Sequence, residues 1–431
     1  MPSTEAPDLA IIGAGLAGVI CLHYARQAGL NTLLLERSGT IGGLWARLPP
    51  WQDIQVNRVD WTLGDLPISG EDQAGILGNI RSWVDRFELA PFIRLNTPVT
   101  RAWHADGRWQ LQTPHTRYSA RWLVAATGVH NRPVVPDPPR AASTIRELHS
   151  SQLVDPGQLT GRTVLVVGGG ASAYDLLDLC FEHGAARVVW VYRSLRWMAP
   201  TRKPKRLAGG LRSLARQQML GLSADQISQS VHEDLCQRYE QFGVQDIRPR
   251  EPFHYDRDQL IPGRRRMLEH FASIERHRGE VTCIEGGTVR LTDGASLPAD
   301  LILWGTGYAL DLGYFSLPAL AGLTRPQDLA ARCGSLFRSL DAPNLFFPAP
   351  SLLETTGASP WAYAHACRSI VSHLRGTAEL DMQPVTRKLN HFELIGFLAR
   401  HDPGSYPADT WRGVYEALAF AHPDTQSLPI P

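Results

Sequence analysis

Two glycine-rich turns carry the residue pattern best suited to chemistry in this 431-residue chain. The first reads G-A-G-L-A-G from Gly13 to Gly18, and the second reads G-G-G-A-S-A from Gly168 to Ala173. Glycines at such spacings let a backbone approach a pyrophosphate, and the N–H groups that begin the following helix face its negative charge. Both turns therefore predict dinucleotide binding.

The elements around the first turn support that prediction. The segments from Asp8 to Ile12 and from Leu33 to Glu36 are typical of buried strands, and Val19 to Gln27 has helical spacing. Glu36 ends the second strand, where an acid accepts hydrogen bonds from ribose hydroxyls. Because strand, turn, helix, strand and acid follow in that order, a dinucleotide is favoured over a turn that merely tolerates glycine.

The second turn is also flanked by a strand, a helix and a second strand, but a different type of residue follows that second strand. A strand begins at Thr163, a helix runs to about Glu182, and the second strand, from Arg187 to Tyr192, is followed by Arg193 rather than by an acid. A guanidinium at this position can hold a 2′-phosphate through two charge-assisted hydrogen bonds, which favours NADPH over NADH. The alternative interpretation is an arginine that is simply solvated.

Two further strands share one feature. Leu123 to Ala126 runs into Thr127 and Gly128, and Leu301 to Trp304 is followed by Gly305, Thr306 and Gly307. One lies before the second glycine turn and the other after it, so they are typical of the points where an inserted domain begins and ends.

The predicted fold class is α/β, with two Rossmann-like dinucleotide-binding domains, the second inserted in the first. The first domain comprises residues 1–150 and 305–431, and the second comprises residues 151–304. Between the turns we expect a helix from Ile80 to Glu88 and a small antiparallel layer. The segment at about 195–278 lacks strand alternation and predicts a helical insertion.

Composition narrows the class of partner. The chain has 43 basic and 42 acidic residues. This balance gives no broad positive electrostatic field that would attract nucleic acid or an anionic membrane. Its six cysteines form no C-x-x-C pair and no zinc spacing, so no metal site is expected. Without a signal-peptide pattern or an apolar stretch of membrane-spanning length, we expect a soluble cytoplasmic protein with a small-molecule partner. A homodimer is left open.

Taken together, these motifs resemble those of the class B flavin-dependent monooxygenases, the group that contains flavin-containing and Baeyer–Villiger monooxygenases. The resemblance covers most of residues 8–375. It rests on the first turn with Glu36 and Arg37, on the second turn, and on three short motifs: G-G-L-W at Gly42 to Trp45, A-T-G at Ala126 to Gly128, and T-G-Y at Thr306 to Tyr308.

The resemblance implies that the first unit holds FAD and the second holds NADPH. NADPH would reduce the flavin, and O2 would then form a C4a-hydroperoxide that oxygenates a small organic substrate, with N- or S-oxygenation favoured. The enzyme would be a single-component monooxygenase.

The same resemblance assigns individual residues. Asn57 falls about where an active-site Asn lies near the hydroperoxide, although an Asn in a turn would look the same. Ser359 and Pro360 begin a helix that runs to about Arg375 and whose positive end faces the reduced flavin. The implied cofactor-binding residues are Gly13, Gly15, Leu16, Ala17, Gly18, Glu36, Arg37, Gly43, Leu44, Trp45, Val99, Thr127, Gly128, Gly168, Gly170, Ala171, Ser172, Arg193, Thr306 and Gly307.

The sequence departs from one fingerprint of this family. Of F-x-G-x-x-x-H only His149 is kept, since Ser143 and Ile145 stand at the Phe and Gly positions. This weakens a Baeyer–Villiger assignment most and leaves two alternatives. One is an aromatic hydroxylase or halogenase, and the other is an FAD- and NADPH-binding redox sensor or reductase that does not oxygenate.

Overall fold

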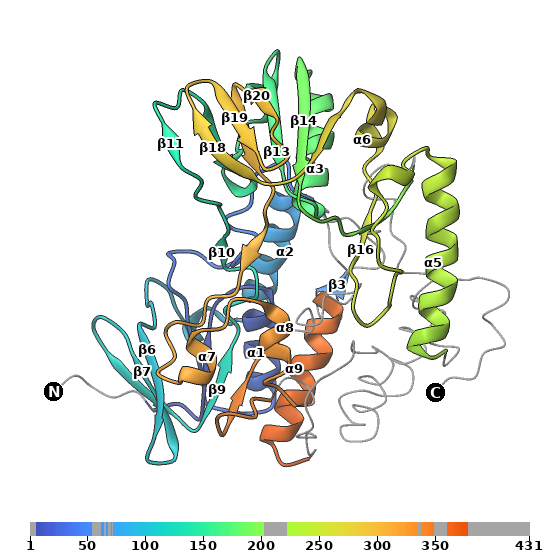
Figure 1. The fold of residues 1–431 in the computed structure, drawn as a ribbon. Coiled ribbons are helices and arrows are strands. Elements are labelled where there is room, and N and C mark those ends of the chain that lie inside the picture. Colours follow the sequence, from blue (N-terminus) through green and yellow to red (C-terminus); the bar gives the residue numbers. More distant parts are fainter. Residues whose placement is uncertain are drawn as a thin grey trace.

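The computed structural model describes residues 6–53, 62–63, 66–67, 70, 72–201, 222–334, 338–348 and 360–377. Two five-stranded sheets, in which every paired strand is parallel, form its framework (Figure 1). The prediction of an α/β fold with parallel sheets is therefore confirmed. The second sheet is built entirely from chain that lies between two strands of the first.

The first sheet has the strand order β23-β9-β1-β2-β5. Its central strands are apolar and buried on both faces, as is usual for parallel sheets covered on both sides. Helix α1 crosses from β1 to β2, and α9 packs along α1. The bounds are β1 (Leu9–Ile12), α1 (Leu16–Gln27), β2 (Thr32–Leu35), β5 (Ile93–Arg94), β9 (Trp122–Ala125), β23 (Leu345–Phe346) and α9 (Pro360–Leu374).

The second sheet repeats this plan in the order β12-β21-β13-β14-β17. In each sheet the strand that precedes the glycine turn is central. One of its neighbours follows the crossover helix, and its other neighbour leads into a Thr-Gly pair. The bounds are β12 (Arg146–His149), β13 (Thr163–Val167), α3 (Ala171–Glu182), β14 (Arg187–Tyr192), β17 (Glu275–Arg278) and β21 (Leu301–Trp304).

Each sheet has a helical side and a β side. The first packs on α1 and α9 on one face and on the antiparallel β6-β7-β8 layer on the other, which confirms the predicted small layer. The second packs on α3 on one face and on β18-β19-β20 on the other, and α5 adds buried side chains to the apolar cluster around α3. The bounds are β6 (Arg101–Ala105), β7 (Arg108–Gln112), β8 (Arg117–Ala120), β11 (Arg140–Ala141), β18 (Val281–Glu285), β19 (Thr288–Leu291) and β20 (Ser296–Pro298).

Helix α2 (Gln73–Arg86) begins one to two turns earlier than the sequence predicts. Asp72 caps it, because its carboxylate accepts a hydrogen bond from the Gly75 N–H at 2.7 Å. Gly75 and Gly78 lowered the helical signal of this first part. No helix in the described ranges is both long and apolar enough to cross a membrane.

The segment predicted to be a helical insertion is mixed. Its described residues contain helices α5 (Ala224–Gln241) and α6 (Arg265–Glu269), but also strands β15 (Trp197–Ala199) and β16 (Leu260–Pro262). It ends in β17, which completes an edge of the second sheet. The sequence E-R-H-R of β17 is polar and does not alternate, so strand patterning could not find it.

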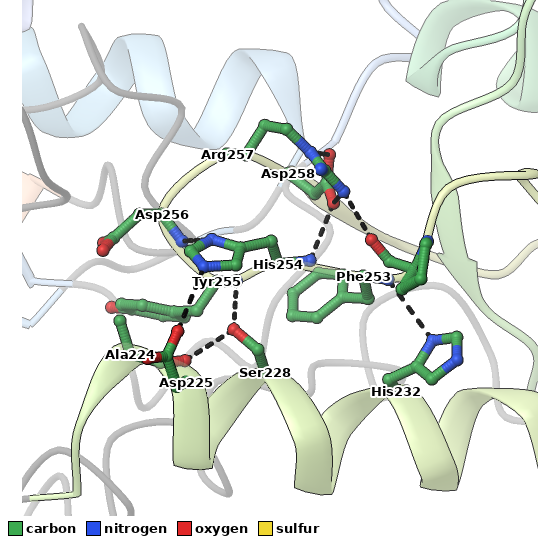
Figure 2. A network of polar contacts seen from close by, with 11 residues as sticks. Ala224, Asp225, Ser228, His232, Phe253, His254, Tyr255, Asp256, Arg257 and Asp258 are labelled. Atoms are coloured by element: carbon green, nitrogen blue, oxygen red, sulfur yellow. Dashed lines mark hydrogen bonds and ion pairs between the residues drawn. The ribbon is translucent and has the colours of Figure 1, made fainter.

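Helix α5 is fastened to the loop that follows it (Figure 2). The Tyr255 N–H donates to Ser228 Oγ at 2.8 Å, and the Phe253 N–H donates to His232 Nδ1 at 3.3 Å. His254 Nε2 lies 3.4 Å from a carboxylate oxygen of Asp225. Because helix side chains satisfy loop backbone groups, α5 and this loop are held together as one unit.

Two connections join the sheets, and they run side by side. Strand β10 (Arg132–Pro133) pairs antiparallel with β22 (Tyr308–Ala309). The Gly307 carbonyl lies 3.0 Å from the Val134 N–H, which donates to it, and 3.0 Å from His149 Nε2. Burial lowers the pKa of His149, although this carbonyl contact opposes the shift. His149, at the end of β12, therefore ties the second sheet to the connection that contains Gly307.

The predicted boundary at residue 150 does not coincide with the change of sheet. Strands β11 and β12 both precede it, yet β11 pairs with β18 and β12 pairs with β21. The chain thus leaves the first sheet before Arg140.

A histidine on β17 gives the fold a testable pH dependence. His277 Nδ1 lies 2.9 Å from Asp293 and Nε2 lies 3.1 Å from Glu275, so both nitrogens donate when the ring is protonated. Burial lowers the pKa of His277, but the two carboxylates outweigh it and the pKa is raised. A raised folded-state pKa stabilises the fold below the unfolded pKa of about 6.5, and this stability is lost as pH rises through the folded value.

We therefore expect the urea midpoint of the wild type to fall more between pH 6 and pH 8 than that of His277→Gln. His115→Gln is the matched control, because His115 is exposed. Equal slopes for His277→Gln and the wild type would contradict this assignment.

Candidate dinucleotide-binding sites

The first glycine turn is packed against a neighbouring strand end with no room for side chains. Gly13 has φ +105°, and a Cβ there would lie 2.6 Å from the Ala126 carbonyl oxygen. A Cβ on Gly18 would lie only 1.9 Å from the Gly13 carbonyl oxygen. The turn therefore requires glycine at both positions, and it lies against Ala126 and Thr127 directly after β9.

The second turn repeats this contact. Gly168 has φ +139°, and a Cβ there would lie 2.2 Å from the Gly305 carbonyl oxygen. A Cβ on Gly169 would lie 1.8 Å from the Ser194 carbonyl oxygen. Gly169 and Gly305 were not among the predicted cofactor-binding residues. Thr306 and Gly307 follow Gly305 directly, so they lie at the same strand end.

The helices after the two turns begin without a side-chain cap. Gly15 and Gly170 stand at the N-cap positions of α1 and α3, and neither helix has an acidic residue in its first turn. By contrast, α2 and α5 are capped by the side chains of Asp72 and Ser223. Uncapped N–H groups at the positive end of a helix are suited to an anion such as a pyrophosphate. The predicted residues in these first turns are Leu16, Ala17, Ala171 and Ser172.

Glu36 is held at the end of the first unit by backbone groups. It is buried, and one carboxylate oxygen accepts from the Ala14 N–H at 2.7 Å. The other accepts from the N–H and the hydroxyl of Ser38, each at 2.8 Å. A carboxylate has about four acceptor positions, so these three contacts leave capacity for a ribose hydroxyl. The site therefore fits the adenosine part of a dinucleotide, and Ser38 is a supporting residue that the sequence did not reveal.

The G-G-L-W segment lies against the first glycine turn. Gly43 has φ +58°, and a Cβ there would lie 2.7 Å from the Gly15 Cα. Trp45 is half-buried against the core beside α1, and Leu44 is also half-buried. Arg37 is exposed next to Glu36.

The remaining predicted site residues either pack against other side chains near the first sheet or fall outside the described part of the chain. Val99 is half-buried and packs on the core of the β side of the first sheet. The Thr127 hydroxyl lies 3.4 Å from the Tyr314 hydroxyl. Asn57 and Ser359 lie outside the described residues, while α9 begins at Pro360, as predicted.

Arg193 follows β14 at the strand end where the sequence placed it. Its side chain is 80% exposed, and its guanidinium lies 2.9 Å from the carboxylate of Glu280. No sequence pattern indicates this partner, because the two residues are far apart in the chain. The ion pair shows that Arg193 can meet an anion at this edge of the sheet.

The fold and these turns define an α/β protein with parallel sheets and dinucleotide-type glycine turns. The chain belongs to the pyridine nucleotide-disulphide oxidoreductase family, whose model matches residues 10–233.

Its curated relatives include flavin-dependent monooxygenases. Indole-3-pyruvate monooxygenase YUCCA8 of Oryza sativa is 32% identical over 41% of this chain and 45% of its own length. A Baeyer–Villiger monooxygenase of Streptomyces coelicolor is 25% identical over 70% of this chain and 64% of its own length. The chain spans about half the length of several relatives that it matches, including YUCCA8.

Solved structures of this enzyme group share the fold. An oxidised steroid monooxygenase bound to NADP has a TM-score of 0.63 at 20% identity, covering 86% of this chain and 85% of the other. The class of relatives therefore matches the resemblance that the motifs indicated.

Gly18→Ala tests the first turn. Its Cβ would overlap the Gly13 carbonyl, so we expect a loss of stability of about 1–3 kcal/mol and a lower FAD content after purification. Gly78→Ala is the control, because a Cβ there meets nothing within 4 Å and alanine favours helix α2. Melting temperature and the flavin-to-protein absorbance ratio give the result. Normal flavin content in Gly18→Ala would contradict the assigned site.

Proposed function

We propose that this chain is an FAD- and NADPH-dependent monooxygenase that oxygenates a small organic substrate at nitrogen or sulfur. One observation carries the proposal. The same packed glycine turn and uncapped helix occur twice, once beside a buried acid and once beside an exposed arginine. Two such units in one chain suit two different dinucleotides, which an enzyme needs when one cofactor reduces the other.

The first unit is the proposed FAD site. Glu36 would accept from a ribose hydroxyl, and the first turn of α1 would face the pyrophosphate. In the second unit, α3 would face the pyrophosphate of NADPH and Arg193 its 2′-phosphate. When bound, the flavin supplies the redox chemistry and the activation of O2, while the protein binds, orients and excludes water.

The relatives support an oxygenase. YUCCA8 and the Streptomyces protein are named as monooxygenases, and the steroid monooxygenase was solved with NADP. We carry this class of activity to the present chain as part of the proposal. The partners would then be O2 and a small molecule.

The cysteines speak against a dithiol reductase, which the family name would also allow. All six are free, and burial raises the pKa values of Cys180, Cys333 and Cys367. Cys367 also donates to the Ala17 carbonyl at 3.5 Å inside the core between α9 and α1. Buried thiols that stay protonated are poor nucleophiles. A non-oxygenating sensor or reductase would therefore have to work without an accessible cysteine pair.

The proposal favours oxygenation at nitrogen or sulfur over insertion into a ketone because the F-x-G-x-x-x-H fingerprint is incomplete. His149 is present, but it is buried and contacts the Gly307 carbonyl and Ser151. These contacts suit a residue that holds the connections. Ketone insertion and aromatic hydroxylation or halogenation are the alternatives within oxygenases.

Rapid mixing tests the proposed activity. The purified protein should carry FAD, and anaerobic NADPH should bleach it faster than NADH. On mixing with oxygenated buffer, we expect a transient species whose absorbance spectrum differs from those of the reduced and the oxidised protein. An amine or sulfide substrate should shorten the lifetime of this species. A protein without flavin would overturn the proposal. Bleaching without any substrate-coupled O2 uptake would favour the reductase or sensor.

Arg193→Ala tests the cofactor assignment. Loss of a bidentate contact of roughly 1.5–3 kcal/mol should raise KM for NADPH about tenfold to a hundredfold. KM for NADH should change little, because NADH lacks the 2′-phosphate. An equal change for both cofactors would show that Arg193 does not read the phosphate.

A further inference from the structure

The partner of Arg193 lies on the neighbouring strand of the second sheet. Strands β14 and β17 are parallel, with Tyr192 opposite Arg278, so both end at the same edge. The Gly279 N–H donates to the Tyr192 carbonyl at 3.0 Å and extends this contact beyond the last paired residues. Arg193 and Glu280 therefore leave the sheet side by side.

The backbone fixes Glu280 at this place. Its N–H donates to Thr292 Oγ1 at 2.9 Å, and its carbonyl accepts from the Thr292 N–H at 3.0 Å. Glu280 Oε1 lies 2.9 Å from Arg193 Nη1, while 55% of the Glu280 side chain is exposed. A carboxylate is thus held where the guanidinium is to receive a phosphate.

We propose that Glu280 lowers the preference for NADPH by competing with its 2′-phosphate for Arg193. This inference rests on the proposed function. The carboxylate occupies one end of the guanidinium, so a phosphate must displace it or share the fork with it. Exposed ion pairs are weak, so displacement is feasible, but the nearby negative charge opposes the incoming one. Glu280 therefore moderates the preference for NADPH, whereas NADH is unaffected.

The competing interpretation is an ion pair that only stabilises the strand ends. The two differ in what removal of the charge does. A purely structural pair would leave nucleotide affinity unchanged, whereas a competitor, once removed, would release Arg193 for the phosphate. The variant Glu280→Gln removes the charge and nearly preserves the shape.

Equilibrium binding measures this effect without turnover. The FAD-loaded full chain is titrated with NADP+ and with NAD+ in a calorimeter. We expect Glu280→Gln to lower Kd for NADP+ about threefold to tenfold and to leave Kd for NAD+ within about twofold. The gain should shrink at high salt, because exposed charges are screened.

Two variants make the comparison sharp. Glu285→Gln is the matched control, because Glu285 is 53% exposed and pairs with Arg290 in the same part of the molecule. It should change neither Kd. In an Arg193→Ala background, Glu280→Gln should lower Kd for NADP+ by a clearly smaller factor than in the wild type, because the competition for the guanidinium is gone.

The outcomes separate this inference from the proposed function. Wild-type protein that binds neither nucleotide would remove the proposed cofactor and this inference together. Wild-type protein that binds NADP+ with an unchanged Kd in Glu280→Gln would overturn only the role of Glu280. An equal gain for NADP+ and NAD+, or an equal gain with and without Arg193, would also overturn it.

Discussion

At each glycine turn two backbones approach so closely that the position of the following helix is set by the contact. Gly13 meets the Ala126 carbonyl, and Gly168 meets the Gly305 carbonyl, at distances that leave no space for a Cβ. Each contact locks the strand before the turn to the strand that ends in a Thr-Gly pair. The start of the crossover helix is thereby fixed beside the C-terminal ends of the strands, where open α/β sheets bind ligands.

The two units share this backbone but differ in charge. In the first, Glu36 is buried and its carboxylate is largely satisfied by Ala14 and Ser38, so it acts as a rigid acceptor. In the second, Arg193 is exposed and pairs with Glu280, which is also exposed. A buried acceptor cannot rearrange cheaply, whereas an exposed ion pair can exchange partners. Under the proposed function, this difference suits a permanently bound FAD in the first unit and an exchanging NADPH in the second.

The sequence predicted what local patterns control. Both glycine turns, the flanking strands, helices α1 and α3 and the start of α9 follow from apolar runs, glycine spacing and proline. It could not predict β17, because a polar edge strand has no alternation to detect. It also missed Ser38 and Glu280, whose roles arise from contacts that depend on the folded chain. Partners across the sheet are set by strand order, which single-sequence patterns do not encode.

The contacts of His149 explain how the chain tolerates the loss of most of the F-x-G-x-x-x-H fingerprint. His149 uses its ring nitrogens to contact the Gly307 carbonyl and Ser151, and the paired strands β10 and β22 reinforce the crossing. Gly307 has φ +76°, so its carbonyl is presented by a turn that favours glycine. Since His149 bonds to backbone here, the crossing can keep its geometry while Ser143 and Ile145 stand in place of the family's Phe and Gly. His149 Nε2 is a second contact of the Gly307 carbonyl, beside the Val134 N–H that donates to it, so the crossing is held from both sides.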